Sequence, residues 1–136
     1  MLKAGTSRPG GMQAMLTPGA ALVVDDSQTV RSIVSQHLNA LGFADVDVAE
    51  DGQAALVLLR ERQYALMISD WEMQPMGGEQ LVKEVRAGNT KMPIVMITAS
   101  GSRGKSWLAG ADAFLAKPFD EKDFAQAVRS ALAPRK

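Results

Sequence analysis

The sequence predicts an α/β fold in which a five-stranded parallel sheet is covered by helices on both faces. Short continuous apolar runs, such as Ala20–Val24 and Leu66–Ile68, are typical of strands that are buried on both sides. Between these runs, apolar residues recur at the spacing of amphipathic helices. Strands that alternate with helices are joined by right-handed crossovers, and such connections produce a parallel sheet.

Five segments are the predicted strands. The segment 45–48 alternates polar and apolar residues, so we expect it at an edge of the sheet, where it is less deeply covered than the others. The segment 93–98 is apolar until its last residue, Thr98, which carries a hydroxyl. In chain order the predicted strands are 20–24, 45–48, 66–68, 93–98 and 113–116.

The predicted helices follow capping or turn residues and end at glycine or proline. The first begins after Ser27 and ends at Gly42, and the last begins after Asp120. Phe119 and Phe124 flank that last cap at the positions of a hydrophobic staple. The starting signals are Ser27, Asp51-Gly52, Gly77-Gly78 and Asp120, and the ending signals are Gly42, Gly88 and Pro134.

Composition excludes several kinds of site. The chain contains no cysteine and one histidine, which rules out disulfides, thiolate metal sites and multi-histidine metal clusters. That histidine, His37, lies at the edge of the first helix's apolar stripe, so packing is its favoured role over carrying a phosphoryl group. Basic and acidic residues balance at 15 each, and no basic recognition helix is present, so we expect no nucleic-acid partner.

We expect one domain, residues 20–136, after a flexible N-terminal tail, residues 1–19, which holds glycine and proline without periodicity. The apolar runs are too short to span a bilayer, and the N-terminus lacks the apolar block of a signal peptide. A soluble cytoplasmic protein without a membrane partner is therefore predicted.

Polar side chains stand where the predicted strands end: Asp25, Asp26, Asp70, Thr98 and Lys117. In open α/β sheets ligands bind beyond the carboxyl ends of the strands, so we expect these groups to share one rim. Three neighbouring carboxylates repel one another unless cations neutralise them. Mg²⁺ suits such a site because it prefers hard oxygen ligands and retains exchangeable waters.

This set of groups is what phosphoryl transfer to a carboxylate requires. The transition state spreads negative charge over three oxygens, so catalysis consists mainly of positioning and neutralisation. Asp70 would be the nucleophile and form an acyl phosphate. Mg²⁺, Lys117 and the Thr98 hydroxyl would each take one phosphoryl oxygen.

From about residue 20 to residue 133, the chain resembles the response-regulator receiver domains of two-component signalling. The motifs that carry the resemblance are VVDD at 23–26, DWEM at 70–73, Ile97-Thr98-Ala99 and Lys117-Pro118-Phe119. The resemblance implies the flavodoxin-like strand order 2-1-3-4-5. It also implies that Asp70 is the phosphoacceptor and that the sequence encodes a signalling domain, which catalyses only its own phosphorylation and dephosphorylation.

The same resemblance assigns further roles. Asp26 would bind Mg²⁺ directly, Asp25 would assist largely through water, and the backbone carbonyl of Glu72 would complete the protein ligands. Thr98 and Phe114 match the switch pair, in which the hydroxyl moves toward the phosphate and the ring turns inward. The Lys117-Pro118 peptide bond would be cis.

The implied partners are a sensor histidine kinase or a histidine phosphotransfer protein, and a downstream protein target. We expect a stand-alone receiver without an effector domain after Lys136, acting through a protein partner, as a phosphorelay intermediate or as a phosphate sink; one domain of a longer protein is the alternative. It would be a monomer or a phosphorylation-dependent dimer.

Some positions depart from the family pattern. Glu72 often corresponds to a smaller or neutral polar residue, and its carboxylate could reach Lys117 or the metal, so we expect it to modulate autodephosphorylation. Gln74 stands where proline is common, which leaves the loop geometry open. The 19 residues from Thr98 to Lys117 are fewer than usual and rich in glycine, so the fourth helix should be short or irregular.

Two alternatives remain. The segment 99–106 nearly matches a phosphate-binding loop and follows a strand, so nucleotide binding through Lys105 is a second hypothesis. Little chain remains there for a nucleotide site, which argues against it. A third possibility is an interaction module that keeps the fold without taking a phosphate, although the intact charge cluster disfavours it.

Overall fold

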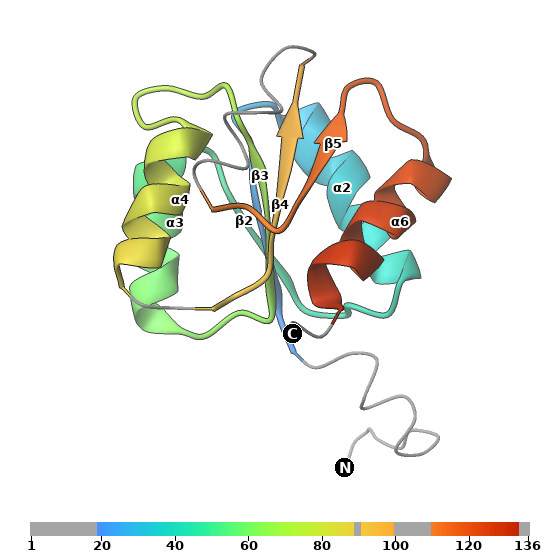
Figure 1. Ribbon diagram of the computed structural model, residues 1–136, viewed down its shortest axis with the longest axis horizontal. Helices are drawn as coiled ribbons and strands as arrows, with labels where there is room; N and C mark the ends of the chain where they lie inside the picture. The colour runs from blue at the N-terminus through green and yellow to red at the C-terminus, as the bar shows by residue number, and fades with distance from the viewer. Residues whose placement is uncertain (1–18, 89–90, 100–109, 134–136) are drawn as a thin grey trace.

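The computed structural model describes residues 19–88, 91–99 and 110–133, and these form the predicted α/β architecture (Figure 1). Its strands are the five segments expected from the sequence, with boundaries that differ by a residue or two. The elements in chain order are β1 (Ala21–Val24), α2 (Gln28–Ala40), β2 (Val46–Ala49), α3 (Gly52–Glu61), β3 (Leu66–Asp70), α4 (Gly78–Ala87), β4 (Ile94–Thr98), β5 (Ala113–Ala116) and α6 (Glu121–Leu132).

The five strands form one parallel sheet in the order β2-β1-β3-β4-β5. This confirms the flavodoxin-like order and places β2 at an edge, as its alternating sequence predicts. The register aligns the strand ends, because Val24 lies opposite both Ala49 and Ser69, and Asp70 lies opposite Ile97. The residues that follow these positions therefore meet at one rim of the sheet.

Helices cover both faces of the sheet, with α3 and α4 on one side and α2 and α6 on the other (Figure 1). Alternate residues of each strand supply the two cores. In β1, Leu22 and Val24 face the α3–α4 side, and Ala21 and Val23 face the α2–α6 side. Each fully buried Leu or Val side chain contributes about 1.5–3 kcal/mol to folding, so both cores hold the strand ends in place.

The predicted caps are present at the helix ends. The side chains of Ser27, Asp51 and Asp120 each accept a backbone N–H at the start of α2, α3 and α6. Gly42, just after α2, has a φ of 107°, a left-handed conformation that glycine adopts without strain. The start of α6 also has the expected staple, since the rings of Phe119 and Phe124 lie 6.1 Å apart.

His37 is half-buried, and its ring lies 5.3 Å from that of Phe124, in agreement with a packing role. Among the described residues, no helix is long and apolar enough to cross a membrane. Three expectations fall outside the described residues. They are the N-terminal tail, apart from Gly19; the short helix predicted between β4 and β5, within 100–109; and most of the candidate nucleotide loop.

Candidate functional site

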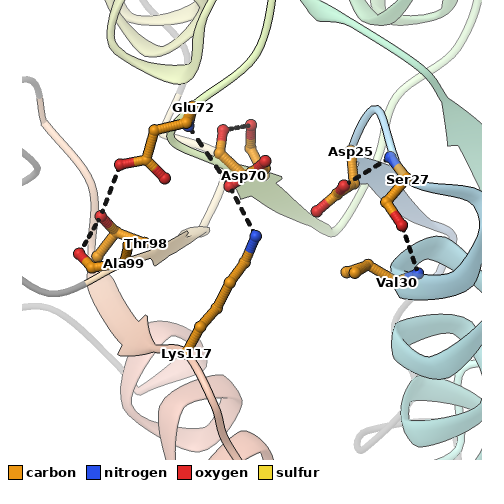
Figure 2. A network of polar contacts seen from close by, with 9 residues as sticks. Asp25, Ser27, Val30, Asp70, Glu72, Thr98, Ala99 and Lys117 are labelled. Atoms are coloured by element: carbon orange, nitrogen blue, oxygen red, sulfur yellow. Dashed lines mark hydrogen bonds and ion pairs between the residues drawn. The ribbon is translucent and has the colours of Figure 1, made fainter.

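The predicted polar residues lie at the rim formed by the carboxyl ends of β1, β3, β4 and β5, where Figure 2 shows Asp25, Asp70, Thr98 and Lys117. Asp25 directly follows β1, and Asp70 and Thr98 are the last residues of β3 and β4. Lys117 directly follows β5, and its backbone N–H donates to the Thr98 carbonyl at 2.9 Å. The parallel sheet thus gathers side chains that lie far apart in the sequence.

Asp25 is nearly inaccessible, with 2% of its surface exposed, whereas Asp26 is exposed. The Ser27 backbone N–H donates to the Asp25 Oδ1 atom at 2.8 Å. The other oxygen, Oδ2, is buried and has no hydrogen-bond partner among the described residues. A buried carboxylate oxygen without a partner is costly, so this atom is available for a ligand.

Asp70 is also 2% exposed and lies between an ammonium group and a backbone amide. The Nζ atom of Lys117 is 3.3 Å from Asp70 Oδ1, and the N–H of Glu72 donates to the same oxygen at 3.4 Å. Close packing of the backbone holds the aspartate in place: a Cβ atom at Gly78 would lie 2.4 Å from the Asp70 carbonyl oxygen. Only glycine fits there without a shift of the backbone.

Burial is the main cause of the unusual electrostatics of this rim. It raises the pKa of Asp70 to about 6; the negative charge of Asp25 adds to the rise, and Lys117 opposes it. Burial likewise raises the pKa of Asp25, against the lowering effects of the Ser27 N–H and of Lys117. The carboxylates therefore carry an unfavourable concentration of negative charge that a bound cation would relieve.

The donor atoms fit a divalent metal. One carboxylate oxygen from each of Asp25, Asp26 and Asp70 can be chosen so that all three lie within 4.8 Å of one another. All are hard oxygen donors, and the unpartnered Asp25 Oδ2 atom belongs to one of these residues. This chemistry matches Mg²⁺ and excludes a soft-metal site.

Thr98 and Glu72 form a contact that the sequence did not predict. The fully buried Thr98 hydroxyl lies 2.9 Å from the Ala99 carbonyl oxygen, to which it can donate, and 3.4 Å from Glu72 Oε2 (Figure 2). Because a hydroxyl has one proton, the shorter contact to the carbonyl is the stronger hydrogen bond. The Glu72 carboxylate nevertheless lies beside the hydroxyl expected to bind a phosphoryl oxygen.

Phe114, the expected partner of Thr98 in the switch, is half-buried on the edge strand β5. It lies opposite Met96 in the sheet and packs against the core beneath α3 and α4. The Lys117-Pro118 peptide bond that follows this strand is cis, as the resemblance implies. The Gln74-Pro75 bond, in the loop whose geometry the sequence left open, is also cis.

Comparison with known proteins identifies the family. A profile of the response regulator receiver domain matches residues 21–129. This chain belongs to the receiver domain family. It is 36% identical over 114 residues to chemotaxis protein CheY-3 of Vibrio cholerae serotype O1, covering 79% of this chain and 88% of that protein. Chemotaxis protein CheY1 of Helicobacter pylori is 41% identical over 104 residues, or 72% of this chain and 84% of that protein.

Solved structures agree with the family assignment. The structure of the chemotaxis response regulator CheY4 of Vibrio cholerae superimposes on this receiver domain with a TM-score of 0.77. The two are 31% identical, and the match covers 84% of this chain and 98% of that one. Receiver domains are signalling modules of two-component systems, in agreement with the function that the sequence predicts.

The sequence analysis missed one residue of this receiver, Arg31, and missed the structural role of another, Gly78, which it had read only as a helix-starting signal. Gly78 is glycine because α4 begins against the backbone of Asp70, a proximity that only the fold reveals. Arg31 donates from its guanidinium to the Asp25 carbonyl oxygen at 2.6 Å. The available signal was its position, since a basic residue in the first turn of a helix opposes the helix dipole and calls for a local partner.

Proposed function

We propose that Asp70 accepts a phosphoryl group from a histidine kinase or a histidine phosphotransfer protein in a Mg²⁺-dependent reaction. The observation that carries this proposal is the convergence of three carboxylates with the Lys117 ammonium 3.3 Å from Asp70. Asp25, Asp26 and Asp70 would hold the metal together with the backbone carbonyl of Glu72. Bound Mg²⁺ would supply positive charge to the phosphoryl oxygens.

The chain's own residues account for the rest of the reaction. An oxygen of ionised Asp70 attacks phosphorus, the bond from phosphorus to the donor imidazole breaks, and its electron pair leaves with the imidazole. With a pKa of about 6, Asp70 is mostly ionised near neutral pH. Lys117 neutralises a phosphoryl oxygen, and the Thr98 hydroxyl donates to another.

Phosphorylation would then change a surface that partners recognise. The Thr98 hydroxyl would leave the Ala99 carbonyl for the phosphoryl group, and Phe114 would move inward from its half-buried position. The two relatives are named chemotaxis proteins, which supports a protein as the downstream target. The cytoplasmic location and the phosphorylation-dependent dimer remain predictions.

The main competing proposal is an interaction module of the same fold that takes no phosphate. Glu72 supports it, because a carboxylate beside Thr98 brings negative charge close to the position of the incoming phosphoryl group. The buried Asp25 Oδ2 atom without a partner favours the phosphoacceptor instead, since it suits a metal ligand.

Phosphorylation by acetyl phosphate distinguishes these proposals. The full chain is incubated with acetyl phosphate and Mg²⁺, and intact mass spectrometry measures addition of one phosphoryl group. We expect addition to wild type, none to Asp70→Asn, and none when EDTA removes Mg²⁺. Asp120→Asn, a change at an exposed helix cap, is the matched control and should be labelled like wild type. An unlabelled wild type, or a labelled Asp70→Asn variant, would contradict the proposed function.

A further inference from the structure

Arg31 occupies a helix position that is unfavourable for a cation unless a nearby group stabilises the charge. It lies in the first turn of α2, where the helix dipole favours negative charge, and that turn contains no acidic residue. The side chain is nevertheless half-buried instead of extending into solvent. Its position therefore requires a stabilising contact.

That contact is with the backbone of a predicted metal ligand. The Arg31 Nη1 atom donates to the Asp25 carbonyl oxygen at 2.6 Å, which is the short distance of a charge-assisted hydrogen bond. The Arg31 backbone N–H also donates to the Ser27 carbonyl at 3.0 Å. Arg31 thus joins α2 to the loop of residues 25–27 from both its main chain and its side chain.

The hydrogen bonds around Asp25 leave one of its polar atoms for a ligand. Its N–H donates to the Ala49 carbonyl at 3.1 Å, its Oδ1 accepts from Ser27, and its carbonyl accepts from Arg31. The remaining atom, Oδ2, is the buried oxygen without a partner among the described residues. These contacts fix the orientation of Asp25, whose carboxylate is one of the three in the cluster with Asp26 and Asp70.

We propose that Arg31 is a positioning residue for Mg²⁺: its bond to the Asp25 carbonyl holds the 25–27 loop so that Asp25 and Asp26 present their oxygens toward Asp70. Arg31 is not a catalytic residue, because it acts through the loop. The proposal rests on the proposed function for the identity of the metal and adds a determinant of metal affinity outside the predicted ligands.

The direction in which Mg²⁺ affinity changes when Arg31 is removed distinguishes a positioning role from a purely electrostatic one. A guanidinium near the site repels Mg²⁺, so if Arg31 acted only through its charge, its removal would tighten Mg²⁺ binding. If Arg31 positions the ligands, its removal weakens binding, because polar groups that orient metal ligands typically contribute about 10- to 100-fold in affinity. The two explanations therefore predict opposite shifts.

Calorimetric titration of the full chain with Mg²⁺ provides the test. We expect Arg31→Gln to weaken Mg²⁺ binding by about tenfold or more and Arg31→Lys, which can still donate to the carbonyl, to remain within about threefold of wild type. Arg129→Gln, a change at an exposed arginine on α6, is the control and should match wild type. Unchanged or tighter binding by folded Arg31→Gln would overturn the proposal.

A measurement on wild type keeps the test decisive if Arg31→Gln does not fold. The Nε–Hε signal of Arg31 in nuclear magnetic resonance spectra should shift during Mg²⁺ titration and saturate with the same dissociation constant as the calorimetric binding. A signal that stays unchanged at saturating Mg²⁺ would overturn the role of Arg31. Failure of wild type to bind Mg²⁺ at all would instead contradict the proposed function itself.

Discussion

The ammonium nitrogen of Lys117 lies 3.3 Å from the Oδ1 atom of Asp70, and this pair joins the end of β5 to the end of β3 across the intervening strand β4. Asp70 is buried, whereas about a third of the Lys117 side chain is exposed. The lysine can therefore move toward an incoming group while the aspartate stays fixed. Each residue of the pair leads to a separate prediction.

Replacing Lys117 with alanine should slow phosphorylation without abolishing metal binding. Removal of one charged group that stabilises the transition state typically costs about 10²- to 10³-fold in rate. The loss of a nearby cation should leave Mg²⁺ affinity unchanged or higher. Mass spectrometry of acetyl phosphate labelling and calorimetric Mg²⁺ titration measure the two effects. Lys122→Ala, on the exposed face of α6, is the control, and a Lys117→Ala rate close to that of this control would contradict the assigned role.

The pKa of Asp70 predicts that Mg²⁺ binding weakens in acid. Its value of about 6 means that the carboxyl is mostly ionised near neutral pH and mostly protonated near pH 5. Below pH 6 the metal must displace this proton, so affinity should fall by about tenfold from pH 7.5 to pH 5. Calorimetric titrations at both values measure the change. The fall in Mg²⁺ affinity between these two pH values should be smaller in the Asp70→Asn variant. An equal fall in that variant would show that a group other than Asp70 causes it.

Gly78→Ala should destabilise the protein through steric conflict with the backbone of Asp70. The added Cβ would lie 2.4 Å from the Asp70 carbonyl oxygen and 2.9 Å from the Trp71 Cα atom. We expect a loss of about 2–3 kcal/mol in the free energy of unfolding, as for overpacked sites. Gly19→Ala is the matched control, because within the described part of the chain its Cβ would meet only the Ala65 Cβ atom, at 3.8 Å. Urea denaturation compares the variants, and equal midpoints would show that the backbone adjusts at little cost.

Glu72→Asn should lengthen the lifetime of the acyl phosphate. The Glu72 carboxylate lies 3.4 Å from the Thr98 hydroxyl, so its negative charge should destabilise a phosphoryl group that this hydroxyl binds. A neutral side chain removes the repulsion and leaves Thr98 free to donate to the phosphoryl oxygen. Loss of the phosphoryl mass after removal of acetyl phosphate gives the lifetime. Equal lifetimes in wild type and Glu72→Asn would show that this carboxylate has no such effect.

Much of the fold and the candidate site could be predicted from the sequence because both depend on strand ends. Asp25 and Thr98 directly close apolar runs and Asp70 follows one after Ser69, and in a parallel sheet the carboxyl ends of neighbouring strands share a rim. The edge position of β2 followed from its alternating residues. These inferences require only the periodicity of the chain and the rules that connect parallel strands.

Details that depend on the direction of individual side chains could not be predicted. The contact between Glu72 and Thr98 joins residues 26 positions apart, and the path of the loop after β3 decides it. Arg31 could have pointed into solvent, and only the folded loop shows that it reaches the Asp25 carbonyl. The close approach at Gly78 similarly depends on where α4 begins above the sheet.

Chemical location of the phosphoryl group is the most direct test of the central claim. Borohydride reduction converts an aspartyl phosphate to homoserine, and peptide mass spectrometry can then locate the modified residue in chain phosphorylated by acetyl phosphate and Mg²⁺. The account predicts homoserine at position 70 and unmodified aspartate at positions 25 and 26. A phosphoryl group found on His37, or modification at another carboxylate with Asp70 intact, would contradict it.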